Sequence, residues 1–304
     1  VVYPEHYDRG WHITGTTGMM GAAAACARLL GLDAHRTQMA LGLAASQPVG
    51  LREQFGTMTK PFHPGGAARA GLLAALMARE GFTASPRAIE APRGWAQVVS
   101  TKCDWSQATD ELGQRFEISF NTYKPFACGI VIHPSIDACV QLRERGVRAE
   151  DIARIELRVH SLVLELTGKK EPADGLQSKF SVFHGCAAGL MFGRAGEEEF
   201  SDAIVQREDV VALRRKVQAT VDDRIREESA DVTAHLNNGE TIHLFVEHAI
   251  GSLQRPMTDA NLEAKLTHLS APVLGDARTR PLIDACWQLG RADNVHSLVS
   301  AMRV

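Results

Sequence analysis

Residues 57–69 bring together groups that could bind a carboxylate and move a proton beside it. The stretch reads Thr-Met-Thr-Lys-Pro-Phe-His-Pro-Gly-Gly-Ala-Ala-Arg, so Lys60, His63, Gly65 and Gly66 precede an alanine-rich helix. A cation and free backbone N–H groups at a helix N-terminus favour a bound anion, and an imidazole suits proton transfer next to it. The structural alternative is a solvated Lys-Pro turn, a core histidine and glycines that only begin the helix.

A second stretch, residues 10–18, has a similar arrangement. It reads Gly-Trp-His-Ile-Thr-Gly-Thr-Thr-Gly, so His12, Thr14 and Thr16 stand where the small-residue run 19–27 begins a helix. The glycines and alanines of that run allow neighbouring helices to approach closely. Because an unperturbed imidazole titrates near neutral pH, His12 is a further acid–base candidate.

The middle of the chain supplies four more polar candidates, Lys124, His133, Lys179 and His184. Taken alone, His133 is interpreted as a helix-start residue with a structural hydrogen bond. Lys179, also taken alone, is interpreted as a solvated lysine at the start of a helix. Neither position would be singled out for catalysis by its local sequence.

The elements that must position these residues are helical in the N-terminal part of the chain. We expect a helix over 34–45 with Asp33 as its N-cap, and a helix over 65–80 closed by Gly81. The Ser-Pro pair at 85–86 indicates the start of another helix.

The pattern changes to mixed helix and strand near residue 117. We expect strands over 117–120, 152–164, 217–221, 231–236 and 241–246, and helices over 134–144, 176–193, 201–204, 209–216, 258–269 and 278–290. The alternation in the second strand places Ile155, Leu157 and Val159 on one face. Asn238-Gly239 between the last two strands predicts a hairpin.

Several of these stretches occur together, and in the same order, in a known family. They are Gly-Trp-His-x-Thr-Gly-Thr from residue 10, Gly-Thr-Met-Thr-Lys-Pro-x-His from 56, Gly-Leu-Leu-Ala-Ala from 71 leading to Gly-Phe-Thr at 81, Lys-Pro-Phe-Ala-Cys from 124 with His133 and Asp137-Ala138, and Lys-Phe-Ser from 179. On these residues, over most of its length, the chain resembles the MmgE/PrpD family, which includes 2-methylcitrate dehydratases, cis-aconitate decarboxylases and iminodisuccinate epimerase.

The resemblance implies an α+β fold in which an all-helical domain carries an inserted, smaller α+β lid domain. The helical domain would comprise residues 1–116 and 257–304, the lid domain would comprise 117–256, and the site would lie in the cleft between them. In the family, the residues that match His133 and Lys179 face this cleft, so the resemblance implies that both do so here. At His184 some relatives have tyrosine, and imidazole differs from phenol as an acid because its pKa is far lower.

The implied function is a cofactor-independent lyase that dehydrates a hydroxylated di- or tricarboxylate such as 2-methylcitrate. We assign catalytic roles to His12, Lys60, His63 and His133, and substrate-binding roles to Thr14, Thr16, Gly65, Gly66, Lys124, Lys179 and His184. An epimerase or a decarboxylase acting on a related polycarboxylate, such as iminodisuccinate or cis-aconitate, could use the same pocket. A non-catalytic remnant that binds a carboxylate or a partner chain is the alternative from another class.

Composition excludes several other classes. A formal charge of -3, from 33 Lys plus Arg against 36 Asp plus Glu, gives no reason to expect nucleic acid or an anionic membrane as partner. The longest apolar stretches are interrupted by arginines, so no membrane span is expected. The six cysteines form no C-x-x-C pair, which is typical of reduced thiols in a cytoplasmic protein. No metal site or nucleotide fingerprint is found, so we expect no cofactor.

Two expectations concern assembly. Members of the family usually carry a helical segment before the point at which this sequence begins, and its aspartate and histidine help to build the pocket. We therefore expect a missing N-terminal segment or chain to complete the site. Relatives are commonly homodimers, so a homodimer is expected here. The histidines interpreted as surface or incidental are His6, His35, His160, His235, His268 and His296.

Overall fold

The computed structural model describes residues 1–303 and divides into two compact units. The first runs from Val1 to Phe116 and the second begins at Glu117. Both helices and a four-stranded sheet are present, so the α+β class is confirmed. The arrangement of one unit as a lid on the other stays a prediction.

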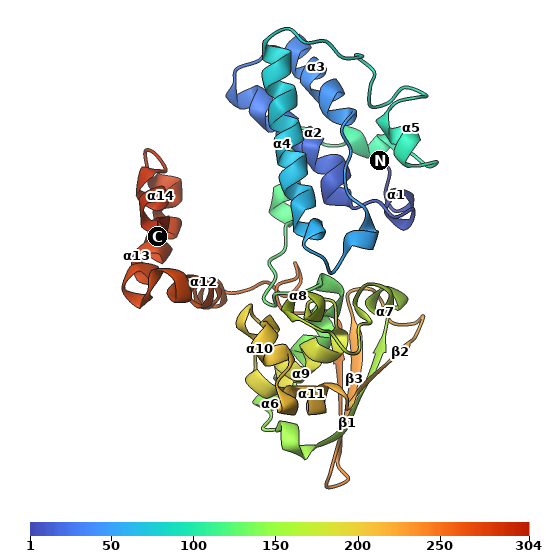
Figure 1. Cartoon of the computed structure of the whole chain (residues 1–304), viewed down its shortest axis with the longest axis vertical. Coiled ribbons are helices and arrows are strands. Elements are labelled where there is room, and N and C mark those ends of the chain that lie inside the picture. Colours follow the sequence, from blue (N-terminus) through green and yellow to red (C-terminus); the bar gives the residue numbers. More distant parts are fainter. Residues whose placement is uncertain (304) are drawn as a thin grey trace. The chain divides into compact units, whose positions relative to one another are not determined.

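The first unit is built on three helices that pack side by side (Figure 1). Its α-helices are α1 (Glu5–Asp8), α2 (Ile13–Leu29), α3 (Ala34–Ala45), α4 (Thr59–Arg79) and α5 (Trp95–Val99). Small residues decide how closely α2 and α4 approach. A Cβ added to Gly71 would lie 2.4 Å from the Cβ of Ala22 and 2.7 Å from the carbonyl oxygen of Met19, so only glycine fits this crossing. Asp33 caps α3 as expected, accepting from the backbone N–H of Arg36 at 2.7 Å.

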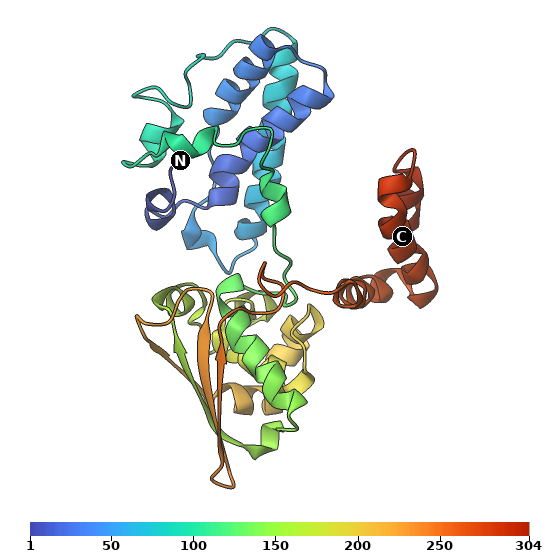
Figure 2. The same ribbon diagram turned by 180° about the vertical axis from the view of Figure 1, so that it is seen from behind.

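The second unit contains the sheet, in strand order β2-β1-β3-β4. Its strands are β1 (Ile152–Val159), β2 (Val217–Val221), β3 (Ala230–Leu236) and β4 (Thr241–Val246), and its helices up to the sheet's end are α6 (His133–Glu144), α7 (Ser161–Thr167), α8 (Gly175–Ser178), α9 (Val182–Phe192), α10 (Asp202–Val205) and α11 (Glu208–Arg214). β1 pairs with β2 in parallel and with β3 antiparallel, and β3 pairs antiparallel with β4. Helix α6 contacts β3 and β4, α9 contacts β2, and Figure 2 shows α6 beside the sheet.

Burial along β1 follows the expected alternation. Ile155, Leu157 and Val159 are buried, whereas Arg154 and Arg158 on the other face are exposed. One face of the sheet therefore joins the core and the other carries charged side chains. The predicted hairpin joins β3 to β4.

Three further helices follow the sheet: α12 (Asp259–Leu274), α13 (Asp276–Gln288) and α14 (His296–Met302). Thr258 and Asn261 form a capping box at the start of α12. The return of this segment to the helical domain stays a prediction. Across residues 1–303, no helix is both long enough and apolar enough to cross a membrane.

Two expected elements are wrong. Residues Glu117–Phe120 form a 3-10 turn whose side chains are exposed, and no described strand pairs with them; a short apolar run does not make a strand without a neighbour. The Ser-Pro pair at 85–86 does not start a helix. Ser85 instead begins a turn, because its carbonyl accepts from the N–H of Ala88 and its hydroxyl accepts from the N–H of Arg87.

Two predicted elements are shorter than expected because side-chain caps interrupt them. The strand expected over 152–164 ends at Val159, and His160 then caps α7 by accepting from the N–H of Leu162. The helix expected over 176–193 is broken into α8 and α9. Ser181 starts α9 anew by accepting from the N–H of His184 at 3.1 Å.

Candidate active site

His12 and His63 are brought together in the first unit, although 51 residues separate them. His12 is the N-cap residue of α2, and His63 lies in the second turn of α4. Their Nδ1 atoms are 2.8 Å apart, and both side chains are buried, with 8% and 4% of their surface exposed. Packing of α2 against α4 thus converts two separate sequence candidates into a hydrogen-bonded pair.

The contact between two Nδ1 atoms restricts the tautomers of the pair. A hydrogen bond needs one donor and one acceptor, so in the neutral pair only one of the two Nδ1 atoms carries a proton. The ring that donates has a bare Nε2, and the ring that accepts has Nε2–H. In the neutral pair one Nε2 is therefore a base and the other Nε2–H is an acid. Once the bare Nε2 has gained a proton and the other Nε2 has lost one, movement of the shared proton between the Nδ1 atoms makes both rings neutral again, with these roles exchanged.

The loop between α3 and α4 fixes the position of both rings. The backbone N–H of His12 donates to the carbonyl of Gly50 at 3.1 Å. Gly50 has φ +104°, and a Cβ there would lie 2.9 Å from Nδ1 of His63. The loop therefore needs glycine at this position. Any side chain would displace the imidazole, and any other residue would be strained at this φ.

Burial and a nearby cation keep both histidines neutral. The pKa of His12 is lowered to about 4, chiefly because burial disfavours the charged form, and next because of the charge of Lys60. The pKa of His63 is lowered by the same two causes. Lys60 lies three residues before His63 on α4, so the two share one face of the helix. At neutral pH the site thus combines a nearby cation with a neutral imidazole pair.

Helix α4 begins at Thr59, six residues before the expected start at Gly65. Proline is tolerated in the first turn, because the N–H it lacks has no partner within the helix, and Pro61 is the third residue of α4. Gly65 and Gly66 consequently lie within the helix, where backbone N–H groups bond to earlier carbonyls. The prediction that these two glycines offer free N–H groups is therefore wrong. The argument that they bind the substrate through those groups no longer holds.

The two threonines after His12 differ in environment. Thr14 is exposed. Thr16 is buried, and its Oγ1 lies 2.7 Å from Nε2 of His6. His6 was interpreted as a surface residue, yet only 1% of it is exposed, and its ring lies parallel to that of Trp11. Its burial depends on packing between distant segments, so no local pattern signals it.

In the second unit, Lys124 lies near His133. Nζ of Lys124 donates to the carbonyl of Cys128 at 2.9 Å, close enough to His133 for its charge to act on the imidazole. Burial lowers the pKa of His133 to about 3, and the charge of Lys124 acts in the same direction. His133 is therefore a neutral imidazole at physiological pH.

Lys179 and His184 both make contacts typical of structural residues. Nζ of Lys179 pairs with Glu197 at 2.5 Å. His184 is fully buried in α9, with Nε2 at 2.8 Å from the carbonyl of Glu199, and burial lowers its pKa to about 4. Their assignment to substrate binding stays a prediction. Within residues 1–303, no three His, Cys, Asp or Glu side chains are placed to hold a metal ion.

Comparison with known proteins identifies the family of this chain. The MmgE/PrpD N-terminal domain matches residues 1–108, and the MmgE/PrpD C-terminal domain matches residues 126–289. The chain belongs to the MmgE/PrpD family.

Three relatives that sequence comparison finds are named as decarboxylases or a dehydratase, which are lyases. The chain is 24% identical to a cis-aconitate decarboxylase of Aspergillus terreus over 319 residues, which cover 97% of this chain and 65% of the relative. It is 24% identical to the human cis-aconitate decarboxylase over 96% of this chain and 63% of the relative. It is also 24% identical to the 2-methylcitrate dehydratase of Escherichia coli, over 78% of this chain and 53% of the relative. The chain thus spans less than two thirds of the length of each.

Proposed function

We propose that this chain carries the acid–base part of a cofactor-independent lyase that dehydrates a hydroxylated di- or tricarboxylate such as 2-methylcitrate. The observation that supports this most directly is the hydrogen-bonded pair of His12 and His63. Dehydration requires a base for the proton on carbon and an acid for the departing hydroxyl. A pair with one bare Nε2 and one Nε2–H offers both at once.

In this mechanism Lys60 stabilises the charge that builds on the substrate carboxylate as the neighbouring carbon loses its proton. The bare Nε2 of the pair removes that proton, and Nε2–H of the other ring delivers a proton to the hydroxyl, which leaves as water. Movement of the shared proton between the Nδ1 atoms then makes both rings neutral again with their acid and base roles exchanged, and proton exchange with water at the Nε2 atoms restores the starting arrangement. A preorganised charge-stabilising donor of this type contributes about 3–4 kcal/mol to lowering the barrier.

Decarboxylation of a related tricarboxylate is the second candidate. The named decarboxylase of Aspergillus terreus aligns with 97% of this chain, against 78% for the named dehydratase of Escherichia coli. In this reaction the pair would deliver a proton to carbon as CO2 leaves. An epimerase acting on a compound such as iminodisuccinate, or a non-catalytic remnant, are further alternatives that the experiment below separates.

The proposal includes several features of the whole protein. We expect the second unit to act as a lid on the first, with Lys124, His133 and Lys179 contributing to the substrate pocket. We also expect a homodimer, a cytoplasmic location and a further segment or chain that completes the pocket. A monomeric mass by light scattering would contradict the dimer.

Proton NMR in D2O tests the reaction directly. The purified chain would be mixed with 2-methylcitrate, citrate, cis-aconitate or iminodisuccinate. Dehydration is identified for 2-methylcitrate by loss of its CH(CH3) signal with a methyl signal moved to a double bond, and for citrate by a new vinyl signal. Decarboxylation is identified by CO2 release, measured in parallel, and epimerisation by deuterium at the carbon next to a carboxylate without net reaction. No change with any of the four compounds would contradict turnover by this chain alone and support the remnant.

Matched variants test the site. His12→Ala is expected to lower the rate about 10²- to 10⁴-fold, the usual contribution of a general acid or base, and Lys60→Met about 10²- to 10³-fold. His35→Ala and Lys102→Met, at exposed positions of the same unit, should leave it unchanged. Full activity in both site variants would show that the reaction occurs elsewhere.

A further inference from the structure

Arg52 connects the loop that holds the imidazole pair to the first helix of the chain. It is the first residue of a 3-10 turn, Arg52–Gln54, in the loop between α3 and α4. Its guanidinium carbon lies 4.0 Å from the centre of the Tyr7 ring in α1, and its Nη1 donates to the backbone carbonyl of Tyr7 at 3.0 Å. A guanidinium can stack and donate at the same time because it is planar and carries N–H groups at its edge, whereas a lysine ammonium has no such plane.

Helix α1 is bound in turn to two other parts of the first unit. Nε2 of His6 lies 2.7 Å from the hydroxyl of Thr16 in α2. The carboxylate of Glu5 accepts from the hydroxyl of Ser100 and from the N–H of Thr101, both at 2.8 Å. Because these contacts hold α1 independently of the loop, α1 is a firm support for Arg52.

The backbone of Arg52 borders a short β-bridge with the residues just before α2. The N–H of Arg52 donates to the carbonyl of Gly10 at 2.8 Å, and the N–H of His12 donates to the carbonyl of Gly50 at 3.1 Å. The two residues between these hydrogen bonds form an antiparallel bridge. The bridge fixes the register of the loop against His12, so a shift at Arg52 reaches Gly50 two residues away.

Gly50 passes the position of the loop on to both imidazoles. It binds the backbone of His12 and lies against the ring of His63, where an added Cβ would be 2.9 Å from Nδ1. The same Nδ1 lies 2.8 Å from Nδ1 of His12. Hydrogen bonds weaken as their length and angle leave a narrow optimum, so a small displacement of the loop is enough to disrupt the pair.

Arg52 differs from Lys60 in the way it can act on the pair. Burial first, and then Lys60 and His63, lower the pKa of His12. An influence of Arg52 therefore comes through the position of the loop rather than through its own charge. We infer that Arg52 is a positioning residue, which holds the loop by binding Tyr7 and so keeps the imidazole pair hydrogen-bonded. The expected effect on the rate rests on the proposed function, whereas the effect on the pair does not.

Arg52→Lys tests the inference because it keeps the positive charge and loses the planar stack. NMR titration of the imidazole signals should show the pKa of His12 rising from about 4 toward its ordinary 6.5, since a displaced loop admits water to the pair. The rate constant kcat should fall about 10²-fold, the cost of a misplacement of about 1 Å. KM should change little, because Lys60 belongs to α4 rather than to the loop.

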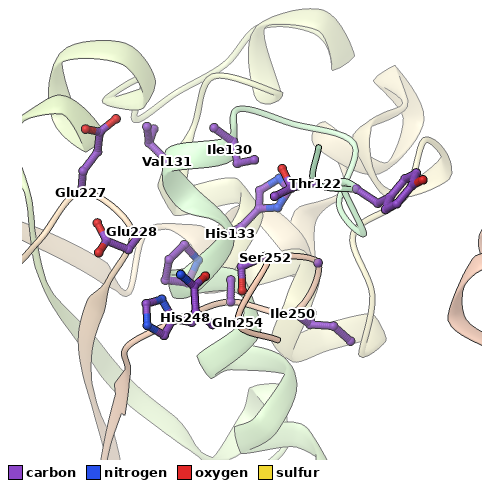
Figure 3. A pocket seen from close by; sticks show the side chains of 14 residues that line it. Thr122, Ile130, Val131, His133, Glu227, Glu228, His248, Ile250, Ser252 and Gln254 are labelled. Carbon is purple, nitrogen blue, oxygen red and sulfur yellow. The ribbon is translucent and has the colours of Figure 1, made fainter. Parts of the chain in front are cut away.

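Two controls separate this role from a general loss of stability. Arg36→Lys is the same substitution at an exposed position of α3 and should change neither the pKa of His12 nor the rate. His133 is an internal reference in the second unit, where it lines a cavity of about 230 Å³ (Figure 3). Its titration should be the same in every variant. A change at His133 that accompanies the change at His12 would indicate a loosened chain and overturn the inference.

A double-mutant cycle tests whether Arg52 acts through Tyr7. Tyr7→Phe keeps the ring and the carbonyl and should preserve the pKa of His12, whereas Tyr7→Leu removes the ring and should raise it. If the stack is the shared cause, Tyr7→Leu combined with Arg52→Lys should shift the pKa no further than the larger single change. Additive shifts, or an unchanged His12 titration in Arg52→Lys, would overturn the inference.

The titration also separates this inference from the proposed function. If Arg52→Lys does not fold, Tyr7→Leu against Tyr7→Phe decides by the same measurement. Absence of turnover in the unsubstituted chain would reject the proposed function, and the pKa of His12 in the variants would still decide the role of Arg52.

Discussion

Val49 and Gly15 bind each other through their backbones, and this contact holds the loop that positions the imidazole pair. The N–H of Val49 donates to the carbonyl of Gly15 at 3.3 Å. A Cβ added to Gly15 would lie 2.0 Å from the carbonyl oxygen of Val49 and 3.4 Å from the Cβ of His63. The start of α2, the loop between α3 and α4, and α4 itself therefore meet at Gly15. The space beside its Cα has room for a hydrogen atom but not for a methyl group.

Gly15→Ala should accordingly displace the loop and destabilise the first unit. We expect a loss of about 1–3 kcal/mol, typical of overpacking, with a further loss of activity as His63 moves. The matched control is Gly21→Ala in the same helix, where a Cβ has nothing within 4 Å. This change should stabilise by about 0.5–1 kcal/mol through helix propensity. Urea denaturation of both variants measures the difference, and equal effects would contradict the close contact.

Lys60→Met should raise the pKa of His12. The charge of Lys60 is the second cause of the lowered value of about 4, after burial, so removing it while keeping the apolar stem shifts the value toward 6.5. Titration of the imidazole signals by NMR measures the shift. Lys60→Arg preserves the charge and should leave the pKa low, and Lys102→Met serves as a surface control. An unchanged value in Lys60→Met would show that burial alone sets it.

Stability should fall as the solution is acidified from about pH 6.5 toward pH 4. The folded pKa of His12 lies at about 4, below the ordinary 6.5, so within this window the unfolded chain binds a proton that the folded chain does not. His184 contributes in the same window and His133 to a somewhat lower pH. His12→Asn should reduce the dependence of the unfolding free energy on pH there. A pH profile identical to that of the unsubstituted chain would contradict the lowered pKa.

Thr16→Val should destabilise the first unit by leaving the buried His6 without its partner. The cost of an unsatisfied buried donor is about 1–3 kcal/mol. Thr17→Val is the matched control, because Thr17 is less buried and its hydroxyl bonds only to the carbonyl of Ile13. Its effect should stay within about 0.5 kcal/mol. Thermal unfolding of both variants compares them, and a neutral Thr16→Val would show that the His6 contact contributes little.

Much of the second unit follows from local sequence. Alternation of apolar residues predicts β1, and the Asn-Gly pair predicts the hairpin between β3 and β4. In the first unit, the cap at Asp33 likewise predicts the start of α3. These features depend on interactions within a few residues of the chain, so they can be recognised without knowing the fold. The family resemblance likewise rests on short stretches in a fixed order, and the matching family domains confirm it.

The sequence by itself also determined which residues are chemically able to act: His12, His63 and Lys60 stand in stretches rich in small residues. Only the tertiary structure decided that the two imidazoles meet through their Nδ1 atoms, that His6 is buried, and that α4 starts at Thr59 so that Gly65 and Gly66 lose their free N–H groups. Each of these depends on the crossing of α2 and α4 or on the packing of a distant segment. Such contacts join residues far apart in the chain, and no local pattern encodes their distance or their burial.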